Sequence, residues 1–305
     1  MVAFGGNALL PDPLDPSSQE SRARALAGAL RLVNPSGEGM VLVHGNGPQV
    51  GMILLRIEAT RDRIPPDPLD VLVAETQGSI GYLLARTIRS SFGSSAGSEE
   101  VAAIMTQVLV DGSDPAFSHP TKPVGPFYGE KEALRLREAR GWHLASEPRG
   151  WRRTVPSPRP LRVVEMQTIR EAVTHGHMVI AGGGGGIPVI CGPGGELSGV
   201  EAVVDKDLTA SLIAVALKAE RLVIITSVDA VYRGFGGPAP EPIFQLHLNE
   251  ASKLIDSGEL PPGSMGPKVE AALSFVKATG KMALITDVDH LKEALHHRAG
   301  TWVLP

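Results

Sequence analysis

Short apolar runs of the length of a buried β-strand recur along this chain. They lie at residues 1–4, 40–43, 101–110, 178–181, 222–226 and 282–286. Between most of them the apolar residues follow helical spacing, as at Leu212, Val215 and Ala216. Strands that alternate with helices predict an α/β fold, with a mostly parallel sheet covered by helices on both faces. Ligands of such sheets bind beyond the carboxyl ends of the strands, so we look for chemistry there.

One stretch, residues 111–160, departs from this rhythm. Prolines, basic residues and five aromatic side chains gather there while the strand pattern fades. Long loops without structure are uncommon in compact domains, and the aromatic residues argue against disorder. We therefore predict that this stretch is an inserted, protruding subdomain.

Composition narrows the class of protein. With 305 residues, 43% of them hydrophobic, the chain can bury a core without covalent cross-links. Its single cysteine, Cys191, excludes an internal disulfide and a cysteine zinc site. The chain opens without a cleavable apolar leader and contains no apolar run long enough to span a bilayer. A net charge of −4 argues against a surface for nucleic acid. We expect a cytoplasmic protein with small-molecule partners, acting on neither nucleic acids nor membranes.

Three glycine-rich turns each follow a predicted strand, at residues 5–7, 44–47 and 182–186. Glycine lets the backbone approach an anion closely, and free N–H groups at the start of a following helix favour phosphate or carboxylate. Any one turn could equally be a plain strand-to-helix connection. Three turns at equivalent ends of the sheet predict a shared anion site.

Lys206 stands between Asp205 and Asp207, at the mouth of a helix predicted over residues 208–218. The pattern suits a solvated helix start in which an aspartate caps the helix. It also suits phosphoryl transfer, which needs positioning and charge neutralisation rather than a covalent nucleophile. In that hypothesis Lys206 neutralises the travelling phosphoryl group and Asp207 orients the lysine.

Two further lysines could serve the same anion. Lys268 comes just before another segment of helical spacing, and Lys122 lies between prolines that would hold it on a stiff, extended segment. Taken singly, each could also be an ordinary surface charge. Arg149, Arg152 and Arg153 are interpreted as structural or solvated.

Several familiar enzyme classes lack their motifs here. The chain has no P-loop G-x-x-x-x-G-K-[ST] and neither H-R-D nor D-F-G, which excludes P-loop and protein kinases. Residues 45–51 loosely match a dinucleotide fingerprint, but the acidic residue expected after the next strand is missing. The histidines show no metal-binding spacing, so no metal site made by the protein itself is predicted.

Nine segments together resemble the signature segments of the carbamate kinases, a branch of the amino acid kinase fold. They occur in the family order at residues 5–9, 44–51, 75–82, 120–127, 149–153, 155–158, 183–189, 199–207 and 263–268. The segment around Lys122 and the Arg-Gly-Trp run at 149–151 are typical of this branch rather than of the wider fold.

This resemblance implies a three-layer α/β/α sandwich with one continuous, mostly parallel sheet. Residues 1–218 would form an acceptor lobe that contains the inserted subdomain 111–160, and residues 219–305 a nucleotide lobe. The implied activity is reversible, Mg²⁺-dependent phosphoryl transfer between ATP and carbamate in arginine catabolism, by a homodimer. Mg²⁺ would come with ATP or ADP, bound largely through phosphate oxygens.

The resemblance also implies roles for individual residues. The catalytic set is Lys206, Lys268, Asp207 and Lys122. Carbamate and the phosphoryl group would lie among Gly5, Gly6, Asn7, Gly45, Asn46, Gly47, Gly184 and Gly185. The nucleotide would contact Thr226, Ser227, Asp229, Val231, Tyr232, Met265, Gly266 and Lys268.

Two other functions stay open on the sequence. The same fold could phosphorylate another small carboxylate or a phosphonate, or it could bind a nucleotide as a non-catalytic sensor. The nucleotide segment reads Thr-Ser-Val-Asp at 226–229, where a second aspartate is common, and residues 233–240 are unusually rich in glycine. These departures concern nucleotide affinity more than the type of reaction.

Overall fold

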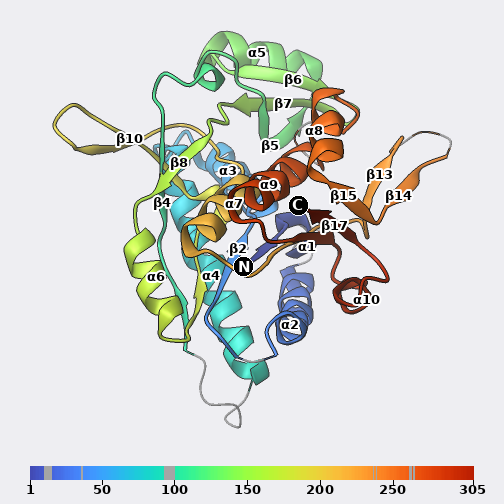
Figure 1. Cartoon of the computed structure of the whole chain (residues 1–305). Coiled ribbons are helices and arrows are strands. Elements are labelled where there is room, and N and C mark those ends of the chain that lie inside the picture. Colours follow the sequence, from blue (N-terminus) through green and yellow to red (C-terminus); the bar gives the residue numbers. More distant parts are fainter. Residues whose placement is uncertain are drawn as a thin grey trace.

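An eight-stranded sheet runs through the middle of the computed structural model, which describes residues 1–9, 16–35, 37–92, 100–235, 237, 239–260, 263 and 265–305 (Figure 1). Its strands are β1 (Val2–Phe4), β2 (Met40–His44), β3 (Val101–Ala103), β9 (Met178–Ile180), β12 (Leu222–Ile225), β15 (Gln245–His247), β16 (Ala283–Thr286) and β17 (Thr301–Leu304). Their order is β15-β17-β16-β12-β1-β2-β9-β3. Every neighbouring pair is parallel except β16 with β17, which confirms the mostly parallel sheet.

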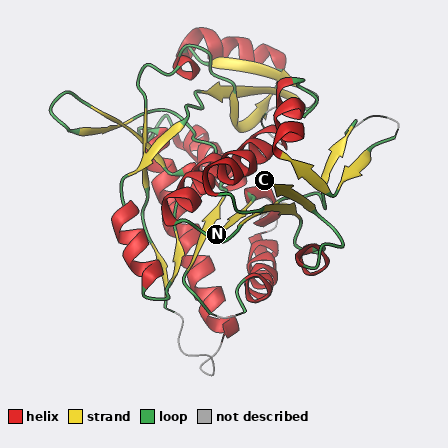
Figure 2. Cartoon of the chain, viewed as in Figure 1, coloured by secondary structure: helices red, strands yellow, loops and turns green. Residues whose placement is uncertain are grey.

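Helices cover both faces of this sheet, as the prediction of an α/β/α sandwich requires (Figure 2). One face carries α6 (Met166–Thr174), α7 (Lys206–Leu217), α8 (Leu248–Asp256) and α9 (Met265–Thr279). The other carries α1 (Gly6–Leu9), α2 (Pro16–Val33), α4 (Leu69–Phe92) and α10 (Leu291–Leu295). Helix α3 (Gly47–Thr60) follows β2 and packs against α4.

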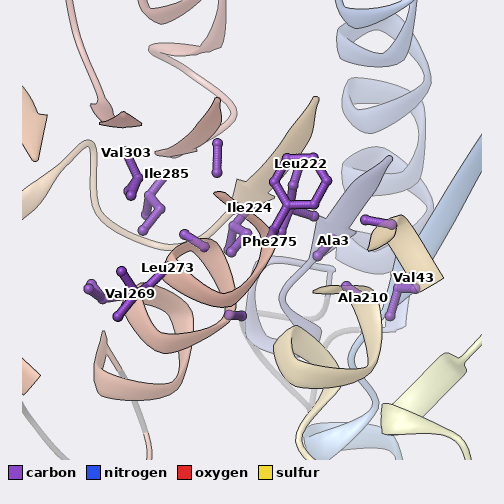
Figure 3. Packing of buried hydrophobic residues seen from close by; sticks show 14 of the residues in the cluster. Ala3, Val43, Ala210, Leu222, Ile224, Val269, Leu273, Phe275, Ile285 and Val303 are labelled. Carbon is purple, nitrogen blue, oxygen red and sulfur yellow. The ribbon is translucent and has the colours of Figure 1, made fainter. Parts of the chain in front are cut away.

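Successive side chains of a strand point to opposite faces of the sheet, so the core is divided into two clusters, one on each face. In β1, Ala3 joins the cluster under α7 and α9, whereas Val2 and Phe4 join the cluster under α2 and α4. Figure 3 shows the first cluster, in which Phe275 of α9 lies against Leu222 and Ile224 of β12. Strands that are buried on both faces explain why these segments are apolar almost throughout.

The expectation of one strand over residues 101–110 was wrong. The chain forms β3, leaves the central sheet at residues 104–106, and continues as β4 (Gln107–Val110) in a second sheet. That sheet has the order β11-β10-β4-β8, with β8 (Pro160–Val163), β10 (Ile187–Cys191) and β11 (Leu197–Gly199). The break falls at Thr106, whose backbone N–H and carbonyl are both bonded to the side chain of Gln77. In the sequence the break is marked by just two polar residues, Thr106 and Gln107, within an otherwise apolar run.

Residues 111–160 carry a three-stranded antiparallel sheet of their own, at the top of Figure 1. It consists of β5 (Lys122–Tyr128), β6 (His143–Glu147) and β7 (Gly150–Val155), with the short 3₁₀ turn η1 (Pro115–Phe117) before it and α5 (Glu130–Arg140) beside it. Val124 and Val155 pack onto Val50 and Leu72, which belong to α3 and α4. The strand pattern that we expected to fade here is therefore present, in short strands that are only half-buried.

A fourth, two-stranded sheet joins β13 (Val231–Arg233) to β14 (Glu241–Ile243).

Helix α7 begins at Lys206, two residues before the predicted start, because Asp205 caps it. Helix α9 begins at Met265 and so includes Lys268 in its first turn.

Candidate functional site

The turns after β1 and β2 meet at the carboxyl edge of the sheet. The backbone N–H of Gly45 donates to Phe4 O at 2.7 Å, and the N–H of Gly5 donates to Ile225 O at 3.2 Å. A Cβ atom on Gly45 would lie 2.5 Å from Gly6 N, so only glycine permits this approach. The turns after β1 and β2 therefore lie in direct contact with each other.

The third glycine turn, residues 182–186, packs on the other side of the β2 turn. Gly184 has a φ of +68° and lies directly against the amide of Asn46, where a Cβ atom would come within 2.2 Å of Nδ2. Gly185 has a φ of +93°, and a Cβ there would lie 2.1 Å from Val204 O. This turn needs glycine both for its left-handed backbone and for its closeness to the chain leading into α7.

A buried polar network fixes these turns from beneath. Asn46 Nδ2 donates to Thr76 Oγ1 at 2.8 Å. Asn46 precedes α3, but its side chain makes no capping hydrogen bond to that helix. Gln77 Nε2 donates to Gly183 O at 2.9 Å and to Thr106 O at 3.1 Å. The motif at 75–82 drew attention to this segment without a role for Thr76 or Gln77. A polar pair in the middle of an otherwise apolar helix face was the signal that could have found them.

His44, the last residue of β2, lies under the same turns and is 1% exposed. Burial lowers the pKa of His44 to about 4, against the opposing effect of its hydrogen bond with Gly45. Its Nδ1 lies 3.1 Å from Gly45 O, so the neutral ring donates its proton to that carbonyl. His44 therefore belongs to the support of the turns, a role that its place in the sequence did not indicate.

Two lysines from different helices share one carboxylate. Lys206 Nζ donates to Asp207 Oδ1 at 2.5 Å, and Lys268 Nζ donates to Asp207 Oδ2 at 3.1 Å. Asp207 is 1% exposed. Burial alone would raise the pKa of Asp207, but the two ammonium charges and their hydrogen bonds outweigh it and lower the pKa to about 2. Burial lowers the pKa of Lys206, an effect that Asp207 opposes and Lys268 reinforces.

Lys122 comes to the same place from the inserted subdomain. It is the first residue of β5, and its Nζ donates to Asp205 Oδ2 at 3.0 Å. Asp205 precedes α7, and its Oδ1 accepts a hydrogen bond from the backbone N–H of Asp207 at 2.9 Å. Three lysines that are far apart in sequence thus converge on two neighbouring carboxylates.

The three lysines, the two carboxylates and parts of the three glycine turns line one cleft with a volume of about 340 Å³. Its lining is Gly5, Gly6, Gly45, Asn46, Gly47, Val50, Val73, Lys122, Pro123, Val124, Gly125, Arg152, Gly184, Val203, Val204, Asp205, Lys206, Asp207, Thr226, Ser227, Gly263 and Lys268. Arg152, which we interpreted as structural or solvated, belongs to this lining, and its Nε donates to Gly125 O at 3.2 Å. Four cationic side chains and two carboxylates give the lining a net charge of +2, which suits a small dianion.

The remaining predicted residues lie outside the lining of this cleft. Gly185 accepts a hydrogen bond from Thr209 Oγ1 through its carbonyl at 2.8 Å. Val231 is fully buried in the core. Tyr232 OH donates to Asp229 Oδ1 at 2.8 Å, on the side of the molecule formed by β13.

Three more predicted residues lie at the starts of helices. Met265 and Gly266 form the first turn of α9. Asn7 lies in α1, and its side chain is outside the described part of the structure, as is all of residue 264.

Neither a metal cage nor a membrane span is found in the described ranges. No group of three or more His, Cys, Asp or Glu side chains there could hold a metal ion. Among the helices that the structure describes, none is both long and apolar enough to cross a bilayer.

Comparisons with known proteins give consistent results. The family model described as the amino acid kinase family matches residues 1–287. A carbamate kinase from Pyrococcus horikoshii is 42% identical over 310 residues, covering 100% of this chain and 98% of that one. A carbamate kinase from Trichomonas vaginalis is 41% identical, covering 100% of this chain and 99% of its own.

Solved structures agree with the sequence relatives. A carbamate kinase from Giardia lamblia bound to AMP-PNP superposes with a TM-score of 0.89 at 38% identity, covering 99% of this chain and 97% of that one. A crystal structure from Aeropyrum pernix gives a TM-score of 0.92 at 42% identity, with 99% and 98% coverage.

Proposed function

Since this chain belongs to the amino acid kinase family and, within it, to the carbamate kinases, we propose that its cleft catalyses ATP + carbamate = ADP + carbamoyl phosphate. The observation that supports this most directly is the buried carboxylate of Asp207 between the ammonium groups of Lys206 and Lys268. Such a group offers two fixed positive charges side by side at the edge of the glycine turns. A transferring phosphoryl group needs this arrangement because its charge is spread over three equatorial oxygens.

The step itself needs no covalent intermediate with the protein. A carboxylate oxygen of carbamate attacks the γ-phosphorus of ATP, and the bond from that phosphorus to the bridging oxygen of ADP breaks. In our proposal Lys206 and Lys268 neutralise the oxygens of the phosphoryl group in transit, and Asp207 holds the two lysines in place. The backbone at Gly5, Gly6, Gly45 and Gly47 allows carbamate and the phosphoryl group to approach closely.

The rest of the acceptor site would be completed from neighbouring segments. Lys122 and Arg152 face the cleft from the insertion, where they can meet the carbamate end of the substrate. Asn46, held by Thr76, supports the β2 turn, with Gly184 packed against it. Asn7 and Gly185 keep the acceptor-side roles expected from the family.

The nucleotide would extend from Thr226 and Ser227 at the end of β12. In our proposal it continues past Asp229 and Tyr232 on one side and past Met265 and Gly266 on the other, while the fully buried Val231 supports this segment from the core. A related enzyme from Giardia lamblia has been solved with AMP-PNP, which supports this use of the fold.

Magnesium would enter with the nucleotide. Both carboxylates of the cleft are already engaged, Asp207 by two lysines and Asp205 by Lys122 and a backbone N–H. Phosphate oxygens and water are the donors that Mg²⁺ prefers when a protein offers few carboxylates. The ion would supply charge neutralisation between the phosphates.

The wider organisation follows the same proposal. Residues 1–218, with the insertion 111–160, would serve the acceptor, and residues 219–305 the nucleotide. The enzyme would act as a cytoplasmic homodimer in arginine catabolism.

A direct assay tests the activity. Purified protein with ADP, Mg²⁺ and carbamoyl phosphate should produce ATP, measured by luciferase. Lys206→Ala should lower kcat by about a thousandfold, because it removes one of the two fixed charges. Lys131→Ala, which changes an exposed lysine of the insertion, is the matched control and should leave kcat unchanged. Undiminished turnover by Lys206→Ala would refute the mechanism, and no ATP from the unaltered protein would refute the function.

A further inference from the structure

Asp205 divides its carboxylate between two parts of the molecule. Oδ1 accepts a hydrogen bond from the backbone N–H of Asp207, which closes the first turn of α7. Oδ2 accepts from the ammonium of Lys122 in the inserted subdomain. A helix cap needs only one side-chain oxygen, so the second oxygen is available for another purpose.

The position of Asp205 is fixed from several directions. Its carbonyl accepts the backbone N–H of Thr209 at 3.1 Å, the first hydrogen bond of α7. Two residues earlier, Val203 N donates to Pro156 O at 2.9 Å, which ties this segment to the end of the insertion. From below, Gly185 packs so closely on Val204 that no larger residue would fit. The carboxylate is therefore held by backbone contacts and does not depend on Lys122 for its place.

Lys122 is held less firmly by its own surroundings. Its backbone pairs with Val155 in β7, but its side chain is 26% exposed, against 12% for both Asp205 and Lys206. A long ammonium side chain of this kind samples many rotamers unless a partner restricts it. The charge-assisted hydrogen bond to Asp205 supplies that restriction at the mouth of the cleft.

We propose that Asp205 is a positioning residue for the reaction: it sets the place of the Lys122 ammonium and ties it to the helix start that carries Lys206 and Asp207. The inference deepens the proposed function and rests on it. Asp205 itself touches no reacting atom in this scheme. It makes Lys122 part of one fixed charge array with Lys206 and Lys268, which lie on helices packed against the main sheet.

Asp205→Asn separates this role from helix capping. Asparagine caps a helix about as well as aspartate. When its oxygen accepts from the N–H of Asp207, however, its NH₂ group faces the ammonium of Lys122, and two donors cannot bond. We expect kcat/KM for carbamoyl phosphate to fall by about tenfold or more, while KM for ADP stays within about twofold. Asp205→Ala, which loses the cap as well, should unfold at a lower temperature than Asp205→Asn.

A double-mutant cycle with Lys122→Met decides whether Asp205 acts through Lys122. If it does, the double variant should be no more than about threefold worse than Lys122→Met alone. The proposal would be overturned if the losses of the two single variants multiplied in the double variant, or if Asp205→Asn had unchanged kinetics. A purely structural cap would lower the unfolding temperature without this non-additivity.

Hydrogen exchange gives a readout that is independent of turnover. Peptides covering β5 should exchange faster in Asp205→Asn and in Lys122→Met than in the unaltered protein, while α7 keeps its protection. Equal exchange of β5 in all three proteins would overturn the proposal. If the unaltered protein makes no ATP, the proposed function fails, and this measurement still decides whether Asp205 holds the insertion.

Discussion

The cleft contains two carboxylates whose contacts with lysine are chemically alike and differ in their setting. Asp207 lies between Lys206 and Lys268, with its side chain 2% exposed and the lysines 12% and 13% exposed. Asp205 meets Lys122 with exposures of 12% and 26%. The first contact lies between two helices packed on one face of the main sheet, and the second joins α7 to the inserted subdomain.

This difference in burial indicates which of the charged groups are held rigidly. A buried carboxylate shared by two lysines cannot lose a partner without leaving an uncompensated charge. A contact at the edge of an inserted subdomain can open at lower cost, because water can replace either partner. We therefore expect the Asp207 group to set the rate of the chemical step and the Asp205 contact to adjust the acceptor end.

The largest effect should come from Asp207→Asn. The neutral amide leaves the ammonium groups of Lys206 and Lys268 to repel each other, so kcat should fall by about a thousandfold. Removing one partner from a buried charge group should also lower the free energy of unfolding by about 3–5 kcal/mol. Steady-state kinetics and urea unfolding measure the two effects. A loss no greater than that of Asp205→Asn would break the contrast between the two carboxylates.

The second prediction concerns pH and the support beneath the glycine turns. In the folded protein the pKa of His44 is about 4, compared with 6.5 in the unfolded chain. Below pH 6.5 the unfolded chain therefore binds a proton that the native protein excludes. This contribution to stability is fully present above pH 6.5 and is lost as the pH falls toward 4. Its full size is on the order of 3 kcal/mol.

Urea unfolding at pH 7.5 and pH 4.5 checks this prediction. The unaltered protein should lose more stability over that interval than His44→Gln, which cannot take up the proton. The window is separate from that of Asp207, whose depressed pKa makes its contribution disappear only between about pH 4 and pH 2. Equal losses of stability in the two proteins would show that His44, beneath the glycine turns, is not the source of the acid sensitivity.

The predicted apolar runs cover six of the eight strands of the central sheet, because these strands are short, apolar and separated by helices, whereas β15 and β17 lie outside the predicted runs. The sequence also indicated Lys206, Lys268 and Lys122, because a lysine at a helix start or between prolines can be recognised from the sequence alone. The structure then brought these lysines to one cleft with the glycine turns. The partner of each lysine was less accessible to reasoning, because a contact across 83 positions, such as Lys122 with Asp205, depends on where the insertion sits.

The features that sequence reasoning missed share a physical cause. Gln77 and Thr106 decide where the chain leaves the central sheet, yet both are polar residues within or beside apolar runs. Arg152 was judged by its charge, whereas β7 turns its side chain toward the cleft. In each case the role is set by a tertiary contact, and neither periodicity nor composition records such contacts.

The smallest expected effect tests whether the position of the whole insertion, rather than Asp205 alone, controls Lys122. Arg140 of α5 donates to both oxygens of Glu58 on α3, at 2.8 and 2.7 Å, outside the cleft. This pair is partly exposed, so Arg140→Gln should lower stability by only about 1 kcal/mol or less. We expect kcat/KM for carbamoyl phosphate to stay within about twofold of the unaltered enzyme. Arg135→Gln, an exposed arginine of the same helix, is the matched control.

Thermal unfolding and carbamoyl phosphate kinetics of the two arginine variants give the answer. A loss in Arg140→Gln as large as that in Asp205→Asn would mean that any contact seating the insertion places Lys122 equally well. In that case the insertion would move as one rigid body, and the Asp205–Lys122 contact would have no special role in placing Lys122. A loss confined to Asp205→Asn would place control in the single carboxylate that joins β5 to α7, since both contacts connect the same subdomain to helices of the main domain.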